Sequence, residues 1–161
     1  MADQKTAPKP QDASMQDDAL RLSEFLCFAV YSANHAFNRV YKPLLDELGL
    51  TYPQYLALVL LWERDDQTVG SLGDRLFLES STLTPLLKRL EALGHISRTR
   101  DPDDERQVRV RLTDKGWAIR EKARAVPACI LEASGLKSDE LGRLRNEIVA
   151  LRKALEDHHK A

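Results

Sequence analysis

The chain has 161 residues, of which 43% are hydrophobic and 30% charged, and its formal net charge is −1 at pH 7. This length and apolar content predict one domain with a core of its own. The near-neutral charge excludes the strongly basic class of nucleic-acid-binding proteins. Any affinity for nucleic acid must therefore come from Lys and Arg side chains gathered on one surface, not from an excess of positive charge. Neither a long apolar run nor a signal-peptide pattern is present, so we expect a cytoplasmic protein that does not cross a membrane.

The N-terminal region divides into a polar tail and a long helix. Residues 1–16 are rich in Lys, Gln, Asp and Pro, which predicts a disordered tail. A helix is expected to begin at Asp17 or Asp18, because acids suit the positive end of a helix. Its main apolar stripe is expected to form a core face and contains Leu22, Leu26, Ala29, Ala33, Ala36 and Val40, with Phe25 and Phe37 alongside.

Cys27 lies on the opposite face of this predicted helix, in line with Tyr31, Asn34, Asn38 and Tyr41. A free cysteine is most often a small buried hydrophobic residue, and no basic residue lies one turn away to stabilise a thiolate. The expected helix start also places Cys27 about two turns beyond the positive end of the helix. The residues alone therefore leave Cys27 open, and a reactive thiol would depend on neutral donors such as tyrosine hydroxyls.

The next segments predict a helix-turn-helix. Thr51 and Gln54 form a capping-box pair at the start of a helix in which Tyr55 and Trp62 are core residues. A loop of Asp65, Asp66 and Gln67 leads to a short helix in residues 68–78, capped by Thr68, with Leu72, Leu76 and Leu78 toward the core. Glu79 and Ser80 make the turn that follows.

The second helix of this motif is the candidate recognition helix. In residues 80–94 an apolar stripe recurs at spacings of three and four, and Gly94 can close the helix; the stripe is Leu83, Leu86, Leu87, Leu90 and Leu93. The opposite face presents Ser81, Thr84, Pro85 and Lys88, with Arg89 on its flank. Short hydroxyls and cations contact phosphates and base edges when a helix lies in the major groove.

The pattern then changes from helical to alternating. Residues 96–100 and 108–112 predict two strands of a hairpin, and Arg106 lies beside Asp104 near its tip. An arginine at the tip of a hairpin is suited to the narrow minor groove of DNA. The alternative is an ordinary solvated hairpin whose charges pair with each other.

The C-terminal region is predicted to be helical. Thr113 caps a helix that Pro127 kinks or interrupts, just before Cys129. A last helix begins at Ser138 and has a narrow seam suited to contact between subunits, formed by Leu141, Leu144, Ile148, Leu151 and Leu155. The two cysteines lack the spacing of a zinc site, and we expect no metal or other cofactor. A transient disulfide and an inert Cys129 both remain possible from the residues alone.

From about Leu20 to the C-terminus, this order of segments resembles the MarR family of bacterial transcription regulators. The resemblance rests on SSTLTPLLKRLEALG, on RDPDDER followed by VRLTDKG, and on LGLTYPQY. It implies a mainly α fold with a small β-hairpin: a single domain, residues 17–161, with a winged helix-turn-helix at 52–113 between dimerisation helices at 17–47 and 114–161. It also implies a homodimer that binds a pseudo-palindromic operator in double-stranded DNA.

Within that family, LSEFLCFAVYSA, RVYKPLL and LTYPQY are similar to the organic hydroperoxide resistance regulators. This similarity implies that Cys27 is the peroxidatic thiol, that Tyr41 and Tyr52 hydrogen-bond its sulfur, and that Cys129 resolves the oxidised Cys27 of the other subunit. Along a straight helix Tyr41 lies about 21 Å from Cys27, so such a site needs the partner subunit or a sharp bend.

These observations give one hypothesis and two alternatives. The hypothesis is a DNA-binding repressor, not an enzyme, which releases its operator when an organic hydroperoxide oxidises Cys27. One alternative is a regulator of the same fold that releases DNA on binding a small apolar ligand. The other is a thiol peroxidase, against which stand the predicted DNA-binding motif and the absence of a CxxC motif near a βαβ pattern.

Overall fold

The computed structural model describes residues 20–160; the predicted tail of residues 1–16 and the expected helix start at Asp17 or Asp18 lie outside the described residues. The chain divides into two units, Met1–Arg39 and Val40–Ala161. The first described element is a 3-10 turn, η1 (Leu22–Glu24), followed by helix α2 (Leu26–Asp46). Helix α2 therefore belongs to both units.

The start of α2 corrects two expectations. Arg21 and Phe25, on either side of η1, have extended backbone with ψ of 122° and 111°, so no continuous helix runs through this region and α2 begins at Leu26. Leu26 is 60% exposed and Phe37 is 42% exposed. The part of the expected core stripe from Leu22 to Ala36 is therefore exposed within one chain, whereas Val40 at its end is half-buried against a hydrophobic cluster.

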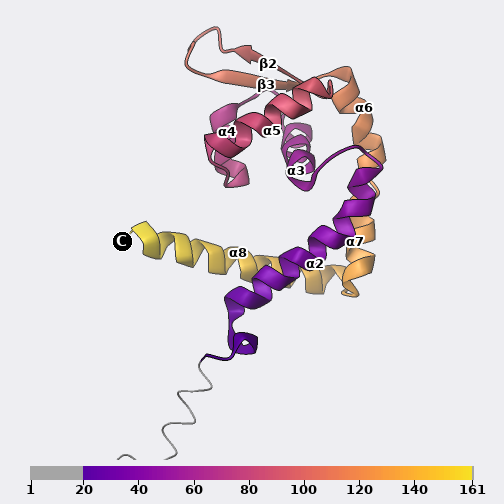
Figure 1. Ribbon diagram of the computed structural model, residues 1–161, viewed down its shortest axis with the longest axis vertical. Coiled ribbons are helices and arrows are strands. Elements are labelled where there is room, and N and C mark those ends of the chain that lie inside the picture. Colours follow the sequence, from indigo (N-terminus) through magenta and orange to yellow (C-terminus); the bar gives the residue numbers. More distant parts are fainter. Residues whose placement is uncertain (1–19, 161) are drawn as a thin grey trace, which may run out of the picture. The chain divides into compact units, whose positions relative to one another are not determined.

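The winged-helix unit, residues 52–112, is a group of helices with a small sheet (Figure 1). Its residues form most of the main hydrophobic core. The unit contains helices α3 (Tyr52–Glu63), α4 (Val69–Leu76) and α5 (Ser80–Ala92) and strands β1 (Gln67–Thr68), β2 (Ile96–Arg100) and β3 (Val108–Leu112). The strands form an antiparallel sheet in the order β1-β3-β2. Because burying one leucine side chain contributes about 1.5–3 kcal/mol, a major stabilising contribution comes from five fully buried leucines, namely Leu58, Leu61, Leu72, Leu87 and Leu90.

Local signals set the ends of these elements. The side chain of Gln54 accepts a hydrogen bond from the Thr51 amide at 2.9 Å, and Thr68 accepts one from the Ser71 amide at 3.1 Å, so both predicted caps are confirmed. Gly94 has φ of 79° just after α5, as predicted. Helix α4 ends at Leu76, before the expected end at residue 78, because Phe77 takes the left-handed conformation with φ of 56°.

Two further expectations are wrong within this unit. Gln67, expected in a loop, lies in β1 opposite Val110, and its buried side-chain amide donates to the carbonyls of Leu60 and Arg64 at 2.9 and 2.6 Å. A strand of two residues has no periodicity to detect. Leu93, expected on the buried stripe of α5, is exposed because it is the residue after the last turn.

The C-terminal region is helical, as predicted. Helix α6 (Asp114–Ala123) is capped by Thr113, and Pro127 lies in the first turn of α7 (Val126–Ser134), so it separates the two helices. A Cβ at Gly116 would collide with the carbonyl oxygen of His95, so α6 approaches the start of the hairpin only with glycine here.

Helix α8 (Ser138–Lys160) carries the predicted seam. Two of its residues, Ile148 and Leu155, are 45% and 63% exposed. No helix in the described part of the chain is long and apolar enough to span a membrane.

Candidate functional site

Helix α5 presents the predicted polar face to solvent. Leu83, Leu87 and Leu90 hold one side of α5 in the core. The opposite side exposes Ser81, Pro85, Lys88 and Arg89, while Thr84 is half-buried. The two cations have no ion-pair partner within residues 20–160. Both remain available for an anionic partner.

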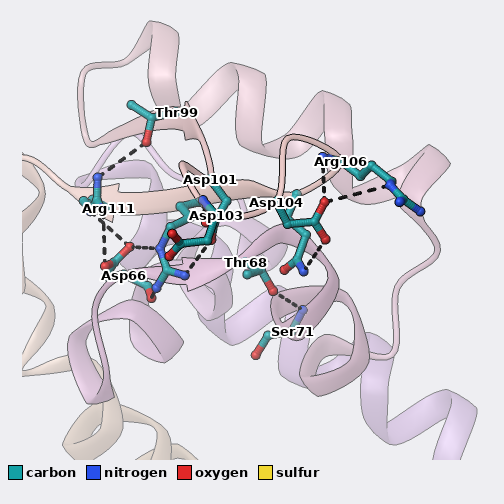
Figure 2. A network of polar contacts seen from close by, with 11 residues as sticks. Asp66, Thr68, Ser71, Thr99, Asp101, Asp103, Asp104, Arg106 and Arg111 are labelled. Atoms are coloured by element: carbon teal, nitrogen blue, oxygen red, sulfur yellow. Dashed lines mark hydrogen bonds and ion pairs between the residues drawn. The ribbon is translucent and has the colours of Figure 1, made fainter.

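The loop between β2 and β3 presents Arg106. Its side chain is 96% exposed, and its guanidinium lies 4.0 Å from the carboxylate of Asp104. Asp104 also organises the loop, because its carboxylate accepts from the Arg106 amide and from the side chain of Gln107, each at 3.1 Å (Figure 2). A pair this long and this exposed contributes little stability, so it leaves the Arg106 side chain free to bind another anion.

A surface hollow joins the two predicted DNA-binding elements. Its lining includes Thr84 of α5 and Arg106 of the loop. Thr68 and Gly70, at the start of α4, and Ser80, at the start of α5, complete this part of the lining. The structure therefore brings Thr84 and Arg106 to one concave surface with hydroxyl and cationic groups.

Most other cations of the unit are neutralised within the chain. Arg75 pairs with Glu63 at 2.5 Å and Arg98 pairs with Glu91 at 2.7 Å. Arg109 pairs with Asp66 at 2.6 Å and with Asp101 at 2.9 Å, and Arg111 pairs with Asp66 at 3.0 Å. Among the described residues of the unit, the exposed cations without an ion pair are Arg64, Lys88, Arg89 and Arg100, and Arg106 has only a long one.

The roles of Asp66, Asp101, Arg109 and Arg111 were not predicted from the sequence. Asp66 and Arg109 are 43 positions apart, and no local pattern signals a contact at that separation. The alternation of β3 placed Arg109 and Arg111 on one face, which was the available signal, but it named no partner.

Cys27 is an exposed free thiol in the first turn of α2. The expectation that it lies about two turns into its helix is therefore wrong, because α2 begins at Leu26. Cys27 therefore lies close enough to the positive end of α2 for the helix dipole to act on its thiol, since that field acts within the first turn.

Tyr41 and Tyr52 lie side by side. Their ring centroids are 4.7 Å apart, and Tyr55 lies 6.2 Å from Tyr41. Burial, together with repulsion from the other two phenolates, raises the pKa of Tyr41 to about 12, and burial raises the pKa of Tyr52. Both hydroxyls therefore remain protonated donors at neutral pH.

Cys129 is half-buried in α7, one residue before Ile130. Ile130 belongs to a second hydrophobic cluster with Leu45, Tyr55, Ala123 and Val126. Cys129 is a free thiol like Cys27. Within the described residues, no group of three or more His, Cys, Asp or Glu side chains is arranged to hold a metal ion.

Comparisons with known proteins agree with this arrangement. Residues 39–122 match the family model described as transcriptional regulator SarA/Rot. The chain is 49% identical over 140 residues to the HTH-type transcriptional regulator TtmR of Methylorubrum extorquens, covering 87% of this chain and 72% of that protein. It is 44% identical over 138 residues to the organic hydroperoxide resistance transcriptional regulator of Bacillus subtilis, covering 86% and 94%.

Among solved structures, the chain is similar to AbfR of Staphylococcus epidermidis. Reduced AbfR bound to DNA matches with a TM-score of 0.72 and 40% identity, over 88% of this chain and 99% of AbfR. AbfR in its disulfide form matches with a TM-score of 0.60 and 35% identity, over 92% and 99%. The curated relatives are transcriptional regulators, not enzymes, which removes the thiol-peroxidase alternative. The chain therefore belongs to the SarA/Rot and MarR-type family of winged-helix transcriptional regulators.

Proposed function

We propose that this protein is a homodimeric repressor that releases its operator DNA when an organic hydroperoxide oxidises Cys27. The observation that carries the proposal is an exposed thiol in the first turn of α2, in a chain whose paired Tyr41 and Tyr52 remain protonated at neutral pH. The 44% identity to a hydroperoxide resistance regulator supports the same assignment.

The DNA-binding surface comprises α5 and the loop of the hairpin. The exposed face of α5 enters the major groove, where Ser81, Lys88 and Arg89 reach phosphates and base edges. Thr84 and Pro85 lie on the same face. Arg106 enters the adjacent minor groove, and Asp104 holds the loop that presents it.

Dimerisation covers the exposed apolar residues of the two long helices. Leu26 of α2 and Ile148 and Leu155 of α8 are exposed within one chain. A second copy of the same chain buries such seams by helix packing. The dimer also provides the two winged-helix units that a pseudo-palindromic operator requires.

The redox step is a two-electron oxidation. The Cys27 thiolate attacks the terminal oxygen of the hydroperoxide, the O–O bond breaks, and the alkoxide leaves and takes a proton to become an alcohol. Cys27 is now a sulfenic acid. The thiolate of Cys129 of the partner subunit attacks its sulfur, and the hydroxyl leaves as water. Two thiols and one hydroperoxide thus give one disulfide, one alcohol and one water.

The tyrosine pair supports this chemistry as neutral hydrogen-bond donors. Tyr41 and Tyr52 of the partner subunit donate to the Cys27 sulfur and stabilise its thiolate. Their raised pKa values keep both protons in place throughout the physiological range.

Disulfide formation changes the spacing of the DNA-binding units. A disulfide holds its two α-carbons within about 7 Å, so the helices that carry Cys27 and Cys129 must take positions compatible with that limit. The two recognition helices must match half-sites about 34 Å apart. Oxidation moves them off that spacing, and operator affinity falls.

Mixed dimers test the cross-subunit disulfide. Cys27→Ser and Cys129→Ser subunits, each carrying a different tag, are mixed, exchanged and treated with cumene hydroperoxide. We expect a disulfide-linked dimer in the mixture, made of one subunit of each kind, and no Cys27–Cys129 bond in either variant alone. Operator release by the Cys27→Ser homodimer at the wild-type peroxide concentration would contradict the proposal.

A regulator that responds to a small ligand is the second candidate. A crevice of about 260 Å³ between α3 and the α6–α7 region is lined by Tyr55, Trp62, Arg120 and Arg124, together with Glu63. Its aromatic rings and its excess of one cation suit a small aromatic acid. Its volume lies below the usual range of ligand pockets, so it ranks second. This candidate predicts release of DNA by such an acid with no loss of thiol.

A further inference from the structure

A cluster of four charged side chains anchors strand β3 to the turn before β1. Arg109 donates from Nε to Asp66 Oδ1 at 2.6 Å, from Nη1 to Asp101 Oδ2 at 2.9 Å, and from Nη2 to the Asp66 carbonyl at 2.8 Å. Arg111 donates from Nη2 to Asp66 Oδ2 at 3.2 Å (Figure 2). We call Asp66, Asp101, Arg109 and Arg111 the charged anchor.

The backbone at Asp66 indicates that this arrangement is held in place at a cost. Its φ is 55°, a left-handed conformation that aspartate tolerates better than most residues but that still carries strain. Both the carbonyl and the carboxylate of Asp66 bind Arg109. The neighbouring Asp65 accepts from the Leu112 amide at 2.9 Å, so the same turn also holds the far end of β3.

Hydrogen bonds connect the anchor to the loop that carries Arg106. The Asp101 carboxylate accepts from the Asp103 amide at 2.9 Å, and the Asp101 amide donates to the Gln107 carbonyl at 2.9 Å. The Gln107 amide donates to the Asp104 carbonyl at 2.9 Å, and the Asp104 carboxylate accepts from the Arg106 amide at 3.1 Å. A continuous path of contacts thus runs from Asp66 to the backbone of Arg106.

The charges of the anchor are balanced internally. The guanidinium of Arg109 lowers the pKa of Asp66 and of Asp101, so both carboxylates are ionised at neutral pH. Two arginines face two carboxylates, which leaves Arg109 and Arg111 poorly suited to bind DNA phosphates. Arg106, in contrast, has a 96% exposed side chain.

We propose that Asp66, through Arg109 and Asp101, is a positioning residue for operator binding: it fixes the loop so that Arg106 reaches the DNA. Asp66 itself does not contact DNA. This inference rests on the DNA-binding part of the proposed function and does not depend on the redox part.

Replacing Asp66 by Asn gives a test with a definite sign. Asn retains the preference for the left-handed backbone and the shape of the side chain but removes the charge. If simple charge repulsion were all that changed, loss of an acidic group near DNA would strengthen binding. If Asp66 positions the loop, Asp66→Asn should instead weaken binding and raise the operator dissociation constant about tenfold.

The dependence of affinity on salt provides the second readout. Arg106→Ala is expected to reduce the salt slope by about one, as for the loss of one phosphate contact. Asp66→Asn should reduce the salt slope by the same amount, although it removes no cation. The double variant, Asp66→Asn with Arg106→Ala, should bind no more weakly than either single variant. Additive losses in the double variant would overturn the proposal.

Arg75→Gln is the matched control. It breaks the Arg75–Glu63 ion pair in the same unit, outside the hairpin, and should leave affinity and slope unchanged. Thermal melting shows whether each variant is folded, and if Asp66→Asn does not fold, Asp101→Asn makes the same test with the same expected sign.

Amide hydrogen exchange in the free protein separates this inference from the proposed function. Asp66→Asn should speed exchange at the Asp101 and Gln107 amides, which hydrogen-bond within the loop, and leave the Leu87 amide in α5 unaffected. Unchanged exchange at Asp101 and Gln107 would overturn the positioning role whether or not DNA binds. A wild-type protein that fails to bind its operator would instead contradict the proposed function.

Discussion

The winged-helix unit and the two helical arms differ in how far their apolar side chains are buried. Here the arms are residues 26–39 of α2 and helix α8. In the winged-helix unit Leu58, Leu61 and Leu87 are fully buried within one chain, whereas Ile148 and Leu155 of α8 are 45% and 63% exposed. The unit completes its core alone, while the arms present apolar seams that a second surface can cover. One chain is thus sufficient for the core of the winged-helix unit, whereas Ile148 and Leu155 of α8 remain exposed.

The largest effect should come from the core of the winged-helix unit. Leu87→Ala removes a fully buried side chain and is expected to lower the free energy of unfolding by about 2–5 kcal/mol, measured by urea denaturation. This loss should be nearly the same at different protein concentrations, because the core lies within one chain. A loss below about 1 kcal/mol would show that the unit does not depend on its own core.

The arms should respond through association instead. Ile148→Glu places a charge on the apolar seam of α8 and is expected to raise the dimer dissociation constant by at least about tenfold, measured by sedimentation equilibrium. Lys153→Glu, away from the seam on the same helix, is the control. An unchanged dissociation constant for Ile148→Glu would remove α8 from the subunit interface.

The titration of Tyr41 tests whether its ring is buried near the C-terminal end of α2. Its folded pKa of about 12 lies above the ordinary value near 10, so its contribution to stability is complete below about pH 10 and is lost as the pH rises through 12. Ultraviolet titration should show a tyrosinate step near pH 12 that is missing in Tyr41→Phe. A Tyr41 step near pH 10 would show that the ring is solvated.

The smallest effect should come from the cation–π contact between Arg152 of α8 and Phe77, the residue that follows α4. The guanidinium of Arg152 lies 4.2 Å from the ring centroid of Phe77. A double-mutant cycle with Phe77→Leu and Arg152→Gln should give a coupling energy of about 0.5–1 kcal/mol from thermal melts. A much larger coupling energy would show that α8 stabilises the winged-helix unit directly, and would contradict the view that the unit completes its core alone.

The sequence predicted best where the physics is local. The hairpin strands Ile96–Arg100 and Val108–Leu112 have the bounds that alternation gave, and the caps at Thr51, Thr68 and Thr113 follow from side chains within three residues. The start of α2 was missed because acids at positions 17 and 18 suit a helix without requiring one. The left-handed Asp66 was missed because its conformation is stabilised by Arg109, far along the chain.

The candidate site divides in the same way. The exposed face of α5 and the exposed Arg106 follow from periodicity and from the position of the loop. The contact between the rings of Tyr41 and Tyr52 was not predicted, since no spacing rule joins the end of α2 to the start of α3. The roles of Cys27 and Cys129 could not be derived from periodicity, because the reactivity of a thiol depends on the groups around its sulfur.

The most direct measurement is a titration of the reduced protein, bound to a fluorescent fragment of its own upstream DNA, with cumene hydroperoxide. Anisotropy and free thiols are followed in the same samples. The redox account predicts that DNA is released in step with the loss of two thiols per subunit, that dithiothreitol restores both, and that Cys27→Ser stays bound. Release without thiol loss, or complete oxidation of Cys27 with DNA still bound, would contradict it.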